Sequence, residues 1–181
     1  MSMHKKVTTL VFIILFSVKA VFSIEINITS EELEEFKVTL YTGFEQIPFE
    51  DFFTLDGDEY DKSALKGRYV LLNLGASWCP FCIKEKSSLQ WLYNNYSDDR
   101  FTVLTVYVNE QINEVKQFIE ENAIELPTAV QPNNKLRQTH AQRVPTSYLI
   151  NSDGYIVARI NLNKEWDSPL ALKVLEYLRK F

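Results

Sequence analysis

The spacing of apolar positions divides residues 69–181 into short buried strands and amphipathic helices. Tyr69–Leu74 is a nearly continuous apolar run, which is typical of a central strand buried on both faces. A helix is expected to begin near Cys79, and Phe101–Val108, rich in β-branched residues, predicts the next buried strand. Apolar residues at helical spacing then predict a helix that ends before Pro127. Because a helix connects the two strands, they are expected to be parallel.

The C-terminal part of the chain predicts a hairpin followed by a helix. Thr146–Ile150 and Tyr155–Ile160 are apolar runs joined through Asp153-Gly154, a pair that favours a tight turn. Ser168 as N-cap and Pro169 at the first helical position open a final helix. The whole order predicts an α/β domain with a mixed central sheet and helices on both faces.

The segment before residue 69 has weaker patterns. Thr29 and Glu32 have the spacing of a capping box, which indicates a short helix. The apolar residues of Phe52–Tyr60 surround an Asp-Gly pair and predict a small hairpin. Ser63–Lys66 has the length of a single helical turn.

The first 23 residues are typical of an export signal. Lys5 and Lys6 form a basic start, Val7–Val18 is mostly apolar, and Val21-Phe22-Ser23 suits a cleavage site. The apolar run is shorter than the roughly 20 residues of a membrane-spanning helix. An uncleaved membrane anchor through residues 7–22 is the alternative. We therefore expect an exported protein of the periplasm or cell envelope, possessing no endoplasmic-reticulum retention signal at its C-terminus.

Composition and charge limit the classes of function. With 181 residues, of which 46% are hydrophobic, the chain suits one packed domain. Its 19 basic and 24 acidic residues leave a formal charge of −5. An acidic surface argues against a nucleic-acid partner, because binding to phosphates needs clustered Lys and Arg.

The segment Trp78-Cys79-Pro80-Phe81-Cys82 is the strongest sign of chemistry in the sequence. It contains the only two cysteines of the chain, three residues apart at the expected start of a helix. Unpaired N–H groups and the helix dipole favour a thiolate at Cys79, whereas Cys82 lies one turn further into the helix. We therefore expect Cys79 to be the attacking thiol and Cys82 the resolving thiol. Pro80 suits the first helical turn, where its missing N–H is not needed.

Other uses of the two cysteines fit the sequence less well. A zinc site needs two further ligands, and the only histidines are His4 and His140, so no metal is expected. Haem attachment requires a His directly after the second Cys, where Ile83 stands. A structural disulfide would close too short a loop to restrain much chain entropy. Redox exchange is favoured, with the cysteine pair itself as redox centre and no further cofactor.

The run Tyr69–Glu85, together with Val144-Pro145-Thr146 and the Asp153-Gly154 hairpin, resembles thioredoxin-like proteins of the TlpA/ResA type. The resemblance covers about residues 49–181. It divides the chain into a signal peptide or anchor (1–23), an N-terminal extension (24–48) and a thioredoxin-like domain (49–181). It implies a thioredoxin-like three-layer fold and a thiol–disulfide reductase of envelope proteins, recharged by a membrane electron donor.

The resemblance also implies roles for individual residues. Pro145 is expected to be cis and to lie beside the cysteine pair, where the backbone of Val144 would align an extended substrate. Glu85 falls on the position of a carboxylate that exchanges protons near the active site, although a solvated helix residue is the alternative. Asn73 stands where ordinary thioredoxins carry a buried acid. Trp78 is expected to shield the site or to pack in the core, and the further substrate contacts are assigned to Pro80 and Phe81.

Several mechanisms remain open at this point. In the favoured one, Cys79 attacks a substrate disulfide and Cys82 resolves the mixed disulfide. The Pro-Phe dipeptide differs from the Gly-Pro of strongly reducing thioredoxins, so an oxidase or isomerase is an alternative. A thiol peroxidase on this fold would place a Thr where Ala76 stands. A non-catalytic module could hold unfolded segments beside Pro145. Reduction of apocytochrome c is a common task of the family, but no residue here points to it.

Overall fold

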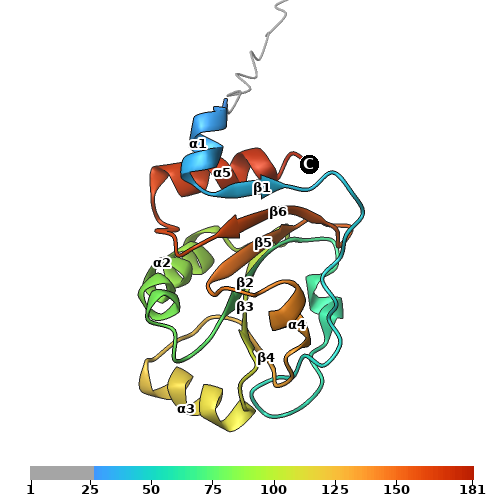
Figure 1. Ribbon diagram of the computed structural model, residues 1–181, viewed down its shortest axis with the longest axis vertical. Coiled ribbons are helices and arrows are strands. Elements are labelled where there is room, and N and C mark those ends of the chain that lie inside the picture. The colour runs from blue at the N-terminus through green and yellow to red at the C-terminus, as the bar shows by residue number, and fades with distance from the viewer. Residues whose placement is uncertain (1–26) are drawn as a thin grey trace, which may run out of the picture.

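A mixed β-sheet of six strands forms the centre of the computed structural model, which describes residues 27–181 (Figure 1). The strands are β1 (Val38–Leu40), β2 (Tyr69–Gly75), β3 (Phe101–Val108), β4 (Thr128–Gln131), β5 (Thr146–Ile150) and β6 (Ile156–Asn161). The helices are α1 (Ser30–Glu35), the 3₁₀ turn η1 (Lys62–Leu65), α2 (Pro80–Tyr96), α3 (Ile112–Glu121), α4 (Lys135–Thr139) and α5 (Pro169–Leu178). The predicted signal or anchor in residues 1–23 lies outside the described part of the chain. Within residues 27–181, no helix is long and apolar enough to cross a bilayer.

The sheet has the strand order β1-β6-β5-β2-β3-β4. Strand β2 pairs in parallel with β3 and antiparallel with β5, and β5 pairs antiparallel with β6. The expected parallel crossover and C-terminal hairpin are therefore confirmed. Strand β4, which pairs in parallel with β3, was not expected from the sequence. With only four residues it is too short to show a period.

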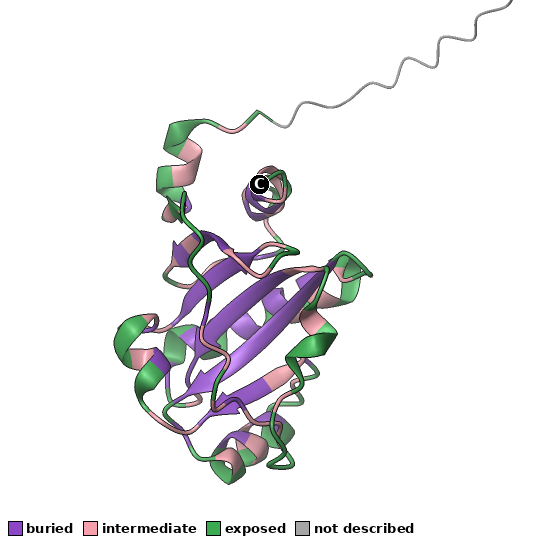
Figure 2. Ribbon diagram, turned by 90° about the vertical axis from the view of Figure 1, so that its right-hand side faces the viewer, coloured by how far each residue is buried: buried purple, intermediate pink, exposed green. Residues whose placement is uncertain are grey.

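Helices cover both faces of the sheet, as predicted. On one face, α2 and α5 contribute Leu89, Leu92 and Val174 to a cluster that also contains Leu71 and Val103 of the central strands. Helix α3 packs on the same side through a smaller cluster. The opposite face is covered by α4 and by the chain between β1 and β2. Strands β2 to β6 are buried along almost their whole length, so the thioredoxin-like fold has three layers, and only the edge strand β1 is largely open to solvent (Figure 2).

The N-terminal segment joins the domain through β1, which pairs antiparallel with β6. Helix α1 begins with the expected capping box, in which the backbone N–H groups of Thr29 and Glu32 each donate to the other's side chain. Phe36, at the end of α1, is buried against Trp166, and Ile47 is buried in the opposite cluster. Residues of the predicted N-terminal extension that the structure describes therefore pack against the thioredoxin-like domain. A three-residue strand has no pattern of its own, and only its partner strand defines it.

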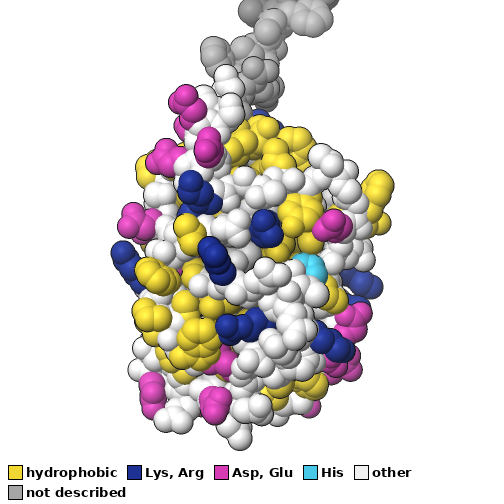
Figure 3. All heavy atoms as spheres, in the orientation of Figure 1, with side chains coloured by type: hydrophobic (Ala, Val, Ile, Leu, Met, Phe, Trp, Pro, Cys, Tyr) yellow, Lys and Arg dark blue, Asp and Glu magenta, His cyan; other side chains and the backbone are white. Residues whose placement is uncertain are grey.

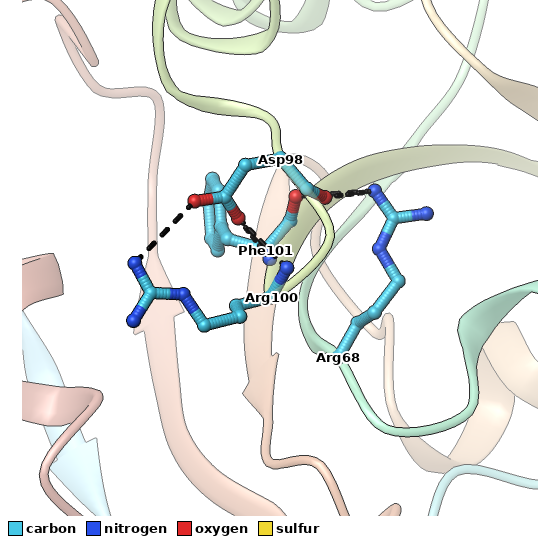
Figure 4. Close-up of polar contacts among 4 residues, drawn as sticks. All are labelled: Arg68, Asp98, Arg100 and Phe101. Carbon is cyan, nitrogen blue, oxygen red and sulfur yellow. Dashed lines mark hydrogen bonds and ion pairs between the residues drawn. The ribbon is translucent and has the colours of Figure 1, made fainter.

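A set of polar contacts aligns the starts of β2 and β3 (Figure 4). The Arg68 guanidinium donates to the carbonyl oxygens of Asp98 at 2.6 Å and Phe101 at 3.3 Å. The Asp98 carboxylate accepts from the backbone N–H groups of Arg100 and Phe101 at 2.8 Å, which keeps its pKa low. Tyr69 and Phe101 thereby start the parallel pair in register, and the carboxyl ends of both strands lie at one edge of the sheet. That edge carries the cysteines.

Candidate active site

The two cysteines lie at the N-terminus of α2, directly after β2. Cys79 is the N-cap of this 17-residue helix, and its Sγ accepts a hydrogen bond from the Cys82 backbone N–H at 3.2 Å. Pro80 occupies the first helical turn, as expected from its sequence position. Cys82 is completely buried, whereas Cys79 retains 4% of its surface. Burial raises the pKa of the Cys82 thiol, and the hydrogen bond with Cys79 adds to this effect.

The loop before Cys79 is held by a buried carboxylate. Glu110 follows β3 and accepts from the backbone N–H of Ser77 at 2.9 Å and from the Ser77 hydroxyl. These bonds connect the carboxyl ends of two neighbouring parallel strands. They leave the first turn of α2 little freedom to move. Glu110 was not singled out in the sequence, because nothing local shows that it turns inward.

The Val144–Pro145 peptide bond is cis, as the resemblance implied. The Cys79 thiol donates to the carbonyl oxygen of Val144 at 3.6 Å. Pro145 is buried and Val144 is half-buried. The sheet order thus brings residues 65 positions apart in the chain into contact beside the attacking sulfur.

Glu85 is buried, so it is not the solvated helix residue considered as an alternative. Its carboxylate accepts from Trp166 Nε1 at 2.6 Å, from the backbone N–H of Lys164 at 3.1 Å and from Asn73 Nδ2 at 3.2 Å. Burial raises the pKa of Glu85, while these hydrogen bonds and the charge of Lys86 oppose the rise.

Lys86 is a second residue of the site that the sequence analysis missed. Its ammonium is buried, donates to Asn73 Oδ1 at 3.3 Å and lies 5.0 Å from the centre of the Tyr107 ring. Burial lowers the pKa of Lys86 to about 8, against the opposing charges of Glu85, the two cysteines and Glu110. The sequence did contain one sign that Lys86 faces inward. It stands four residues after Cys82, on the apolar stripe of the helix that continues to Leu89.

The amide of Asn73 connects the acidic and basic groups behind the cysteines. Its nitrogen donates to Glu85 and its oxygen accepts from Lys86. A Cβ on Gly75 would lie 3.7 Å from Cys82 Sγ and 3.8 Å from Asn73 Oδ1, which are ordinary contact distances, so the thiol and the amide both border this position.

The outer side of the site is apolar and exposed. Trp78 retains 57% of its surface and Phe81 retains 62%, while Pro80 between them is also exposed. The Arg137 guanidinium lies 5.3 Å from the centre of the Trp78 ring. A core role for Trp78 is therefore wrong, and these side chains are free to contact another molecule. Within residues 27–181, no group of three or more His, Cys, Asp or Glu side chains could hold a metal ion.

Comparison with known proteins agrees with this geometry. The model of the AhpC/TSA family matches residues 31–159. The chain belongs to the AhpC/TSA family. A thiol-disulfide oxidoreductase ResA from Bacillus cereus is 29% identical, with 67% of this chain and 77% of the relative covered. Sporulation thiol-disulfide oxidoreductase A from Bacillus subtilis is 34% identical over 50% of this chain and 58% of its own.

One solved structure shares the fold of this chain and part of its sequence. The crystal structure of StoA from Bacillus subtilis superposes with a TM-score of 0.54 at 25% identity, covering 77% of this chain and 95% of that one. This AhpC/TSA-family protein is a thioredoxin-like protein disulfide oxidoreductase of the ResA/StoA type.

Proposed function

We propose that the protein is exported and reduces disulfides of envelope proteins through a cycle between the dithiol and the disulfide of Cys79 and Cys82. The main support is the asymmetry of the two sulfurs. Cys79 caps a helix, receives a backbone hydrogen bond and is the one of the two cysteines that retains exposed surface, whereas Cys82 is fully buried. Attack and resolution are therefore assigned to different residues.

The reaction proceeds by two exchanges. The Cys79 thiolate attacks one sulfur of the substrate disulfide, which forms a mixed disulfide and releases the other sulfur as a thiolate. The Cys82 thiolate then attacks Cys79 Sγ, which closes the Cys79–Cys82 disulfide and releases the second substrate thiolate. Two protons from the cysteines end on the substrate thiols, and two electrons pass to the substrate. The cycle needs no cofactor besides the cysteine pair.

The second exchange requires the buried Cys82 to lose its proton. Removing that proton is unfavourable, because burial disfavours the thiolate. We assign the proton exchange to Glu85, one turn after Cys82 on the same helix, and the balancing charge to the Lys86 ammonium. Asn73 holds both side chains in position through its amide. Lys86 thus acts on the thiolate through its charge and at a distance.

Substrate contacts are assigned to the surface around Cys79. An extended segment of the substrate aligns with the backbone of Val144 beside the cis-Pro145, and the exposed Trp78, Pro80 and Phe81 cover its other side. Apolar side chains of this size exclude water from the exchanging sulfurs.

The location and the direction of electron flow complete the proposal. The signal-like residues 1–23 support export to the periplasm or envelope, with residues 7–22 as a possible tether. The oxidised protein is then recharged by a membrane electron donor. Fractionation of cells that produce the full chain tests the location, and a soluble cytoplasmic form would contradict it.

A pair of matched serine variants tests the exchange. Cys82→Ser is expected to accumulate mixed disulfides with its substrates, because the resolving thiol is absent, whereas Cys79→Ser should accumulate none and lose turnover. Retained turnover in Cys79→Ser would contradict the assignment. A redox titration of the native protein tests the direction, and a potential near −120 mV, at the oxidising end of the range, would count against a reductase.

A further inference from the structure

A groove of about 510 Å³ adjoins the cis-Pro145 and leads away from Cys79. Its walls come from the end of α4, from the loop that contains Arg143 and Val144, and from the end of β6. Val144 lines the groove and also accepts the hydrogen bond from the Cys79 thiol. The groove is therefore continuous with the surface assigned to the substrate.

The charge of this groove is opposite to that of the protein as a whole. Lys37, Arg143 and Arg159 line it, and its lining contains no Asp or Glu, although the chain has a formal charge of −5. Within residues 27–181 none of these three cations takes part in an ion pair. In the view of Figure 3, several Lys and Arg side chains lie over the middle of the molecule, and Asp and Glu side chains lie mostly toward its edges.

Two further observations concern the surroundings of Arg159 and Lys37. The Nε of Arg159 is buried and has no hydrogen-bond partner. Burial is the main cause of the lowered pKa of Lys164, and the like charge of Lys37 nearby lowers it further. Burial lowers the pKa of His140, and the charge of Glu45 partly offsets this lowering, but Glu45 does not line the groove.

We propose that the groove binds acidic residues of the substrate protein that flank its disulfide, so that the enzyme prefers disulfides in acidic extended segments. This proposal rests on the proposed function. An extended chain advances about 3.3 Å per residue, so residues two to four positions from the substrate cysteine reach beyond Pro145. There the guanidinium groups of Arg143 and Arg159 offer paired N–H donors, which suit carboxylates.

Three disulfide-linked peptides test the preference directly. They are identical except at three positions beside one cysteine, which are all Asp, all Asn or all Lys. The measurement is kcat/KM for their reduction by the native protein at low and at high salt. We expect kcat/KM to fall from the Asp peptide to the Asn peptide and again to the Lys peptide, by about two- to fivefold for each charge pair. The differences should largely disappear at about 1 M salt, where the screening length is about 3 Å.

A charge reversal with a matched control locates the effect. Arg143→Glu, at an exposed position, should lower the ratio of the Asp-peptide to the Asn-peptide rate below one. Lys116→Glu is the control. Lys116 is on α3, outside the groove, and its ammonium pairs with Asp56 at 2.9 Å. In this variant the ratio of the Asp-peptide to the Asn-peptide rate should stay at the native value.

The possible results separate the two proposals. Equal rates for the three peptides, or an unchanged ratio in Arg143→Glu, would overturn the acidic preference and leave the disulfide reductase intact. Failure to reduce any of the three peptides, together with a failure to reduce a small aromatic disulfide, would overturn the proposed function, and the groove proposal with it.

Discussion

Replacement of Lys86 by Met removes the one ammonium placed behind the cysteines and keeps an unbranched side chain of similar length. The native ammonium is buried and is held at 3.3 Å from Asn73 Oδ1. Removing one partner of a buried charge pair leaves the other charge unpaired, so the variant is expected to lose stability, and a denaturant titration first checks that it is folded at the assay conditions. In the folded variant the lost charge should appear in the chemistry of the Cys82 thiol.

The magnitude follows from Coulomb's law. Two unit charges about 8 Å apart interact by about 2 kcal/mol at an effective dielectric constant of 20. This energy corresponds to about 1.5 units in the pKa of a thiol. Loss of the ammonium should raise the already high pKa of Cys82 further. A more basic thiolate is a better nucleophile, which compensates for about half of the change, so resolution should slow by about fivefold.

The assay is a single turnover of the reduced protein with a small aromatic disulfide whose released thiolate absorbs light. The first release reports attack by Cys79, and the second reports resolution by Cys82. Burial lowers the pKa of Lys86 to about 8, so its charge is present below that pH and lost above it. The native-to-variant ratio of second-phase rates should be largest near pH 6 and approach one above pH 8.

The control is Lys84→Met, because Lys84 is an exposed cation on the same helix. Its second-phase rate should follow that of the native protein at every pH. A ratio for Lys86→Met that does not change with pH, or an equal slowing in Lys84→Met, would refute the assignment of Lys86 as the balancing charge.

Three further changes have defined outcomes. Burial raises the pKa of Glu85 in the folded state, so the native protein loses stability as the pH rises above about 4.5, by at most about 1.4 kcal/mol per pH unit. Glu85→Gln should lack this loss in denaturant titrations at pH 5 and 7, and an equal pH dependence would contradict the buried acid. Asp98→Ala removes the acceptor for the N–H groups of Arg100 and Phe101 and should lower the unfolding free energy in a denaturant titration, with normal exchange rates. Trp78→Ala should change the free energy of unfolding by about 1 kcal/mol or less and should raise KM for a peptide disulfide several-fold. If KM rises by the same factor for a peptide disulfide and for a small aromatic disulfide, Trp78 does not contact the peptide substrate.

The sequence alone determined the features that depend on local order. Apolar runs and their periods identified β2, β3, β5 and β6, and capping residues identified the starts of α1, α2 and α5. The spacing of Cys79 and Cys82 at a helix start is also local, because the first helical turn by itself places one sulfur over the exposed N–H groups. For the same reason the proposed choice of Cys79 as the attacking thiol follows from the order of residues alone.

Only the tertiary structure decided what surrounds those sulfurs. Trp166 reaches Glu85 across 81 positions of sequence, and Asn73 meets both Glu85 and Lys86 from the neighbouring strand. These contacts depend on which strands are adjacent and on which face of α2 is covered, and sequence period reports neither. The inward position of Lys86 is the clearest case. A lysine on a helix is normally solvated, and here the packing of α2 against β3 holds it in the interior.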